Sequence, residues 1–194
     1  MSKKIKNKKR ERKNPNKAVT ASLNNWWQSK NPVLLYALAF ASLMIIFYAI
    51  LYAGFFRSNI HPYLLSFNAT LSAFILNLLG QNTQHMGSVI SSNLFSIDIK
   101  QGCDALEPMA LFAAIVLAYP TAFLKKVQAV LVATFMLFSL NIVRIVSLFL
   151  TGVYFENLFD LMHIDVWQFL FILAAILLCL VFVRWVNQTT ISHA

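Results

Sequence analysis

Charged residues are scarce in this chain, and cysteine, glycine and acidic residues are scarcer still. Only 12% of the 194 residues are charged, about half the share found in typical soluble domains. The two cysteines exclude a small secreted domain held together by several disulfides. No CxxC, HExxH or paired-histidine spacing is present, and the five glycines form no phosphate-binding loop. We therefore expect neither a metal nor a cofactor.

Apolar residues dominate instead. Hydrophobic residues make up 59% of the chain and aromatic residues 14%. A globule of 194 residues cannot bury that much apolar surface, because small domains leave much of their surface exposed. This excludes a soluble monomer and a disordered chain. The excess apolar surface must face lipid.

The net charge of +9 is concentrated at the N-terminus. Nine of the 16 Lys and Arg residues lie within the first 17 positions. Such a run is typical of a disordered arm that binds RNA or anionic lipid, or of a tail that holds the N-terminus in the cytoplasm. The positive-inside rule favours the second interpretation. Residues 1–30 are therefore predicted to be a disordered basic cytoplasmic tail with an interfacial segment, with no nucleic-acid partner.

Five apolar segments follow, and the first is uncharged from Asn31 to Phe56. About 20 apolar residues suffice to cross a bilayer as a helix. The sequence thus predicts an all-α integral membrane bundle of four to five transmembrane or re-entrant helices. A membrane-embedded domain over 31–185 and a short C-terminal tail over 186–194 complete the chain. The remaining apolar segments are Leu64–Leu79, Pro108–Leu124, Val127–Leu150 and Val166–Val183.

A polar stretch, 81–102, separates the second and third apolar segments. Apolar and polar residues alternate from Phe95 to Lys100, which is the period of a β-strand. Ser88–Ile90 could supply its partner strand. We expect a small extracytoplasmic β-ribbon here.

Basic residues also predict the topology. If segment 64–79 returns to the side it came from, 13 of the 16 Lys and Arg residues are cytoplasmic, including Lys125, Lys126 and Arg184. If it crosses, Lys125 and Lys126 fall outside. The first arrangement is preferred for a multi-pass protein of the plasma (inner) membrane, with the N-terminus in the cytoplasm.

This topology brings three reactive residues to the outer membrane face. Cys103 follows the predicted strand and Gly102, and a cysteine at a helix N-terminus has a lowered pKa and is a stronger nucleophile. The alternative is an inert structural cysteine, which is the favoured interpretation for Cys179. The nucleophilic and structural interpretations of Cys103 both remain open.

Arg144 and His163 stand 41 and 19 positions further along. Arg144 lies in an apolar segment, where a charge is costly, so it either snorkels to the interface or binds a carboxylate or an oxyanion. His163 is either structural or a base that accepts and returns a thiol proton. A nucleophile, a base and a cation on one membrane face indicate thiol acyl transfer.

At these residues the sequence resembles the exosortase/archaeosortase family of integral membrane cysteine transpeptidases. The resemblance covers about 33–185 and rests on Gly102–Glu107, Asn141–Ser147 and His163–Gln168. The last two motifs are similar to the compact branch often called exosortase H. One departure is Ala105, where relatives usually carry glycine.

The resemblance implies a cysteine peptidase or transpeptidase that cleaves C-terminal sorting signals of secreted proteins. Such a signal has a short motif, an apolar helix and a basic tail. Cys103 would form a thioester, His163 would act as base and acid, and Arg144 would hold the oxyanion or orient the thiolate. Glu107 and Asn141 would orient these groups, and stretch 81–102 would offer a strand edge to the substrate. The cleaved substrate protein would then be transferred to a cell-surface acceptor.

The alternatives are a non-catalytic membrane scaffold or transporter subunit, and a nucleic-acid tether acting through the basic tail. Membrane lipid is the other expected partner. The substrate motif, the acceptor and the oligomeric state stay open.

Overall fold

The computed structural model describes residues 32–191, so the predicted basic tail, 1–30, lies outside the described residues. The chain divides into two compact units, 1–38 and 39–194. Of the first unit the structure describes only the beginning of helix α2, which runs from Pro32 to Leu51. The rest of α2 and all of the later elements belong to the second unit.

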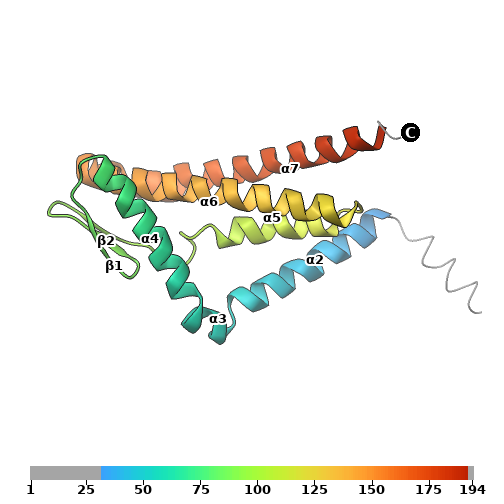
Figure 1. The fold of residues 1–194 in the computed structure, drawn as a ribbon, viewed down its shortest axis with the longest axis horizontal. Coiled ribbons are helices and arrows are strands. Elements are labelled where there is room, and N and C mark those ends of the chain that lie inside the picture. The colour runs from blue at the N-terminus through green and yellow to red at the C-terminus, as the bar shows by residue number, and fades with distance from the viewer. Residues whose placement is uncertain (1–31, 192–194) are drawn as a thin grey trace, which may run out of the picture. The chain divides into compact units, whose positions relative to one another are not determined.

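The strongly apolar segments are helical, as predicted (Figure 1). Within the described residues, three helical segments are long and apolar enough to cross a membrane. They are Pro32–Leu51, Phe123–Tyr154 and Glu156–Gln188. Helix α6 is Phe123–Tyr154, whereas α5 (Leu106–Ala118) is a shorter apolar helix. The chain is therefore a helical membrane protein.

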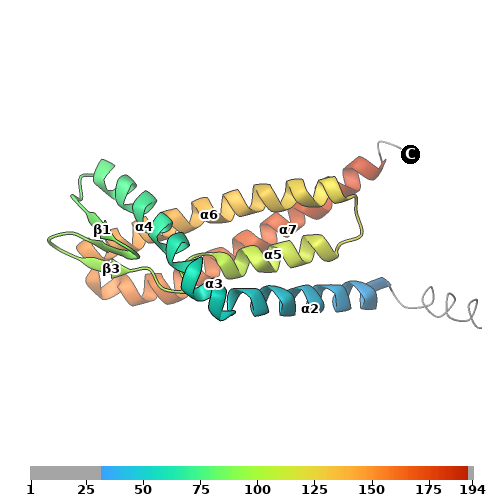
Figure 2. The same cartoon turned by 60° about the horizontal axis from the view of Figure 1, so that its bottom comes forward.

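The predicted segment 64–79 corresponds to helix α4, His61–Leu78, which follows a short helix α3, Gly54–Asn59. Two of its polar residues, Asn68 and Ser72, are buried inside the protein. Helix α4 runs obliquely across α6 in both views (Figures 1 and 2). It is not among the three candidate spans of the described chain, and its buried polar side chains fit a helix that packs on protein.

A three-stranded antiparallel sheet follows α4 in the order β1-β2-β3. The strands are β1 (Gln84–Met86), β2 (Val89–Ser91) and β3 (Ser96–Asp98). The ribbon of β2 and β3 was predicted from the alternating pattern, with β2 shifted by one residue from the expected partner. Strand β1 was not predicted, because its residues do not alternate between apolar and polar side chains.

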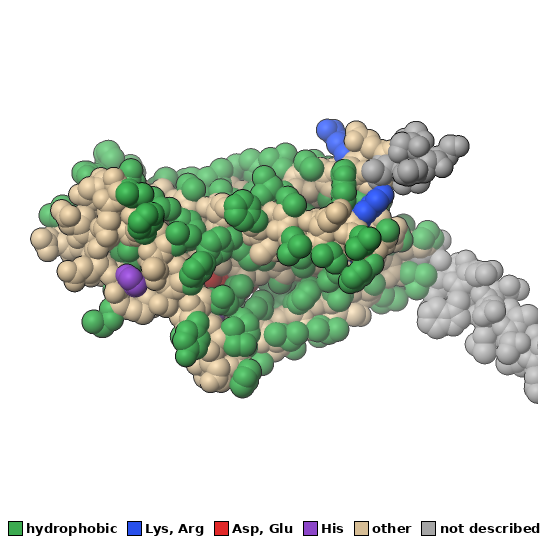
Figure 3. All heavy atoms as spheres, viewed as in Figure 1, with side chains coloured by type: hydrophobic (Ala, Val, Ile, Leu, Met, Phe, Trp, Pro, Cys, Tyr) green, Lys and Arg blue, Asp and Glu red, His purple; other side chains and the backbone are tan. Residues whose placement is uncertain are grey.

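Helix α6 connects two hydrophobic clusters. On one side Leu137 and Leu148 pack with residues of α5 and of helix α7, Trp167–Ile191. On the other side Ile145 and Phe149 pack with α4 and β2. Arg144 lies between these contacts on α6, so the bundle and the sheet hold it from both sides. Hydrophobic side chains also cover the outer surface along the helices (Figure 3).

The connection from α6 to α7 is short and helical except at Phe155. A 3₁₀ turn, Glu156–Leu158, leads into a π-helical segment, Leu161–Val166, that continues directly into α7. Irregular π-helical turns are frequent at functional sites, and this one carries His163. Helix α7 continues to Ile191, into the segment predicted as a C-terminal tail.

Candidate active site

Cys103 lies in a tight turn between β3 and α5. Gly102 has a φ of 91°, and the Cys103 N–H donates to the Lys100 carbonyl at 3.0 Å. Helix α5 begins only at Leu106. The expectation that Cys103 begins the helix is therefore wrong, because the backbone must first complete this turn.

Ala105 closes the turn in the left-handed region, with φ 61° and ψ 9°. This conformation costs a residue with a Cβ roughly 1–2 kcal/mol, and glycine adopts it freely. Ala105 therefore replaces the glycine of the family motif at a position whose backbone favours glycine. The Ala105 methyl is buried in the core beside α5 and α7, and this contact offsets part of the cost.

Asp104 anchors the turn to α4. One carboxylate oxygen, Oδ2, lies 2.6 Å from His61 Nε2, and both residues are buried. The other oxygen accepts the Leu106 N–H at 3.2 Å. The residue next to the cysteine thus joins the start of α4 to the start of α5.

Arg144 reaches the cysteine from α6. Its Nη2 lies 3.8 Å from Cys103 Sγ, and its guanidinium carbon lies 5.6 Å from the centre of the Phe171 ring. Arg144 is only 9% exposed, and its Nε has no hydrogen-bond partner within the described chain. No carboxylate of the described residues pairs with it. A buried guanidinium in this state can bind an anion or a developing oxyanion.

Cys103, Arg144 and His163 line one cavity of about 340 Å³. The His163 ring stacks on Phe159 with centroids 5.8 Å apart, and its buried Nδ1 has no hydrogen-bond partner within residues 32–191. The wall opposite α6 is the segment from Phe95 to Lys100. The fold thus brings together the three residues that the sequence singled out.

The thiol itself is not activated by its position alone. Burial raises the pKa of Cys103 above its ordinary value, and the neighbouring Asp104 carboxylate raises it further. The Arg144 guanidinium acts in the opposite direction and lowers the pKa. The net change in pKa is opposite to the lowering predicted from a helix N-terminus, because the thiol is partly buried and precedes the helix. Arg144 is the nearby charge that favours the thiolate.

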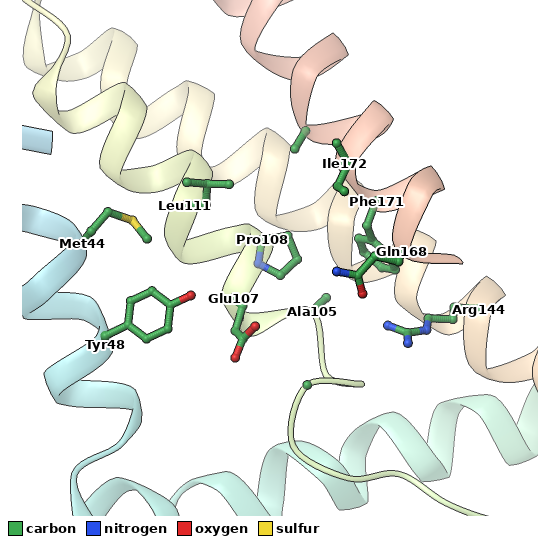
Figure 4. Close-up of a pocket in the computed structure, with 12 residues that line it drawn as sticks. Met44, Tyr48, Ala105, Glu107, Pro108, Leu111, Arg144, Gln168, Phe171 and Ile172 are labelled. Atoms are coloured by element: carbon green, nitrogen blue, oxygen red, sulfur yellow. The ribbon is translucent and has the colours of Figure 1, made fainter. Parts of the chain in front are cut away.

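A second cavity of about 230 Å³ shares Arg144 with the first. Figure 4 shows Tyr48 of α2 and Glu107 of α5 at one side of it, and Arg144 beside Gln168 at the other. Glu107 accepts a hydrogen bond from the Tyr52 hydroxyl at 3.1 Å. Glu107 therefore lines this second cavity and not the cavity that holds the Cys103 thiol.

Asn141 lies one turn before Arg144 on α6 and is fully buried. Its side-chain amide donates to Asn68 Oδ1 on α4 at 3.2 Å. Asn141 lines neither of the two cavities. Its hydrogen bond to Asn68 links α6 to α4.

A family model described as transmembrane exosortase matches residues 27–186. The chain belongs to the transmembrane exosortase family. No curated protein and no solved structure matches it.

In this exosortase the family match includes every residue of the cavity that holds Cys103. His61 was not singled out from the sequence. No local signal could have found it, because His61 and Asp104 are 43 positions apart and meet only in the folded chain. Cys179 lies on α7 and lines neither cavity of the exosortase, in keeping with its structural interpretation.

Proposed function

We propose that this exosortase is a membrane-embedded cysteine peptidase or transpeptidase that cleaves C-terminal sorting signals of secreted proteins. The observation that carries the proposal is the contact of Arg144 Nη2 with Cys103 Sγ, at 3.8 Å, in a cavity that His163 also lines. These three groups supply the nucleophile, the proton carrier and the cation that acyl transfer requires.

The first half of the reaction releases the sorting signal. His163 takes the thiol proton, and Cys103 Sγ forms a bond to the scissile carbonyl carbon. Arg144 stabilises the negative charge that develops on the carbonyl oxygen. The C–N bond then breaks, His163 returns the proton to the leaving amine, and a thioester remains on Cys103.

The second half frees the enzyme. A nucleophile of a cell-surface acceptor, or water, attacks the thioester carbon and gives its proton to His163. The C–S bond breaks, and the proton returns to the Cys103 sulfur. Transfer and hydrolysis thus use the same three residues and differ only in the attacking group.

We place the cavity on the extracytoplasmic side of the plasma membrane and the N-terminus in the cytoplasm. The start of α6 and the end of α7 lie at one end of the bundle, and the sheet lies at the other (Figures 1 and 2). Lys125 and Lys126 lie near the start of α6, and Arg184 lies in the last turns of α7. Blue basic side chains are visible at this end in Figure 3. The positive-inside rule supports a cytoplasmic location for this end.

A processing assay tests the activity. The probe is a tagged secreted protein from the same organism that ends in an apolar helix and a basic tail. We expect Cys103→Ala, Arg144→Ala and His163→Ala each to leave it uncleaved. Cys179→Ala is the matched control and should process it normally. Normal processing by Cys103→Ala would overturn the proposal and favour the scaffold alternative.

The sidedness has its own test. A membrane-impermeant thiol reagent should label Cys103 in intact cells carrying the Cys179→Ala variant, and a reporter fused after Lys126 should remain cytoplasmic. An extracytoplasmic reporter would contradict this orientation without affecting the chemistry.

A further inference from the structure

The sheet beside the cavity has a free edge that leads to the cysteine. We propose that the donor polypeptide binds as a fourth strand on β3, with its main chain hydrogen-bonded to Ser96 and Asp98. This inference rests on the proposed function and adds how the substrate is held. The occupant is an extended segment next to the scissile bond.

The free edge follows from the sheet order and register. Strand β3 is the last strand of the sheet and pairs only with β2 among the described strands. The Ser92 N–H donates to the Phe95 carbonyl, and the Ile99 N–H donates to the Ser88 carbonyl. In an antiparallel pair, alternate residues direct their backbone groups to the partner strand.

Phe95, Ile97 and Ile99 therefore face β2 with their backbone groups. The N–H and C=O groups of the intervening residues, Ser96 and Asp98, point to the opposite edge. An extended peptide can pair with such groups whatever its side chains are, and pockets then select individual side chains.

The same edge continues into the nucleophile. Lys100 is next in the alternation after Asp98, so its carbonyl also points away from β2. That carbonyl accepts the Cys103 N–H at 3.0 Å. Cys103 therefore lies on the free-edge side of β3, just beyond the end of the strand. A peptide paired with β3 would extend directly toward the thiol.

The side chains leave room for this strand. Ser96 and Asp98 are exposed, whereas Ile97 turns inward and packs against both core clusters. The hydroxyl of Ser88 donates to Asp98 Oδ1 at 2.7 Å, which holds the carboxylate toward β2. Ser96 and Asp98 also line the cavity that holds Cys103.

The opposite cavity wall indicates which side chains the added strand would carry. It is formed by Ile145, Leu148 and Phe159, together with Arg144 and His163. Every second side chain of a strand points to the same face. The substrate would therefore place apolar side chains at alternate positions against this wall.

Cysteine cross-linking tests the pairing. The enzyme carries Ser96→Cys together with Cys103→Ala and Cys179→Ala, so that its only thiol is on β3. It is co-expressed with a substrate that the wild-type enzyme processes, in which single cysteines are placed at successive positions before the cleavage site. We expect disulfides at every second substrate position. The matched control is Gln84→Cys on β1, the other outer strand, which should form none.

A second measurement tests the main-chain hydrogen bonds of the substrate. Peptides from the same substrate are N-methylated at one amide at a time and cleaved by the purified wild-type enzyme. Loss of one hydrogen bond should slow cleavage about tenfold, and the sensitive amides should alternate with insensitive ones. Suppose that the substrate is processed but that neither the disulfides nor the sensitive amides alternate along it. This result would overturn the strand pairing and leave the proposed function intact. If no substrate is processed, the proposed function fails first.

Discussion

His61 Nε2 lies 2.6 Å from Asp104 Oδ2, and this buried contact joins α4 to the residue that follows the nucleophile. His61 is 8% exposed and Asp104 is 4% exposed. Because the Asp104 carboxylate also accepts the Leu106 N–H, it fixes both the turn and the start of α5. We infer that the pair positions Cys103 without taking part in the chemistry.

Removal of this anchor should lower the stability of the protein and change the reactivity of Cys103. Asp104→Ala leaves the buried His61 ring and the Leu106 N–H without a partner, which costs about 1–3 kcal/mol for each group left unpaired. We expect a lower melting temperature in detergent and faster alkylation of Cys103 near neutral pH, because the Asp104 carboxylate raises the pKa of the thiol and its removal favours the thiolate. Glu156→Gln, an exposed acid on the α6–α7 connection, is the control and should change neither. An Asp104→Ala enzyme with wild-type melting and alkylation would show that the contact is dispensable.

The pH dependence of Cys103 alkylation should depend on Arg144. Only the thiolate reacts, and burial raises the pKa of Cys103 while Arg144 lowers it. Arg144→Ala removes the lowering influence, so the alkylation profile should move to higher pH. Arg144→Lys retains a cation and should move it less. The measurement is the iodoacetamide rate against pH in a Cys179→Ala background. Identical profiles for all three proteins would contradict an interaction between Arg144 and the thiol.

Gly152 is needed for the sheet to pack on α6. A Cβ at this position would collide with the ring of Phe95, which packs edge-on against Phe149. Gly152→Ala should therefore displace Phe95 at a cost of about 1–3 kcal/mol, and reduce processing because Phe95 also lines the cavity. Gly54→Ala is the matched control, since a Cβ there meets nothing within 4 Å. Equal melting temperatures for the two variants would rule out this close approach.

The amide pair Asn68–Asn141 should matter for stability rather than chemistry. Asn141→Ala leaves the buried Asn68 oxygen without this donor, a loss of about 1–3 kcal/mol. In a double-mutant cycle with Asn68→Ala the two losses should be strongly non-additive. Processing per folded enzyme should stay near the wild-type rate. A large loss of rate in Asn141→Ala with unchanged stability would instead restore the orienting role expected from the sequence.

The sequence was most informative where one local property decides the structure. Long uncharged runs specify membrane helices because the hydrocarbon core cannot solvate free backbone groups. Alternation from Phe95 to Lys100 likewise predicted a strand, since a strand exposes its two faces in turn. By contrast β1 has no such pattern and forms because β2 and α4 lie beside it.

Arg144 could be chosen from the sequence because a charge is unusual in an apolar segment, and Cys103 and His163 because their side chains can supply a nucleophile and a base near the ends of apolar segments. What the sequence could not provide is their electrostatics. Burial of Cys103 raises its pKa, in opposition to the expected effect of a helix end. Burial depends on how α6 and the sheet pack around the thiol, and no local pattern encodes it.

The sequence by itself determined that this is a helical membrane protein and which three residues to examine, because hydropathy and residue chemistry are local properties. Only the tertiary structure decided that His61 holds Asp104, that Glu107 and Asn141 lie outside the thiol's cavity, and that β3 presents a free edge to Cys103. These relationships join segments far apart in the chain. They arise from packing against α6, which the order of residues does not reveal.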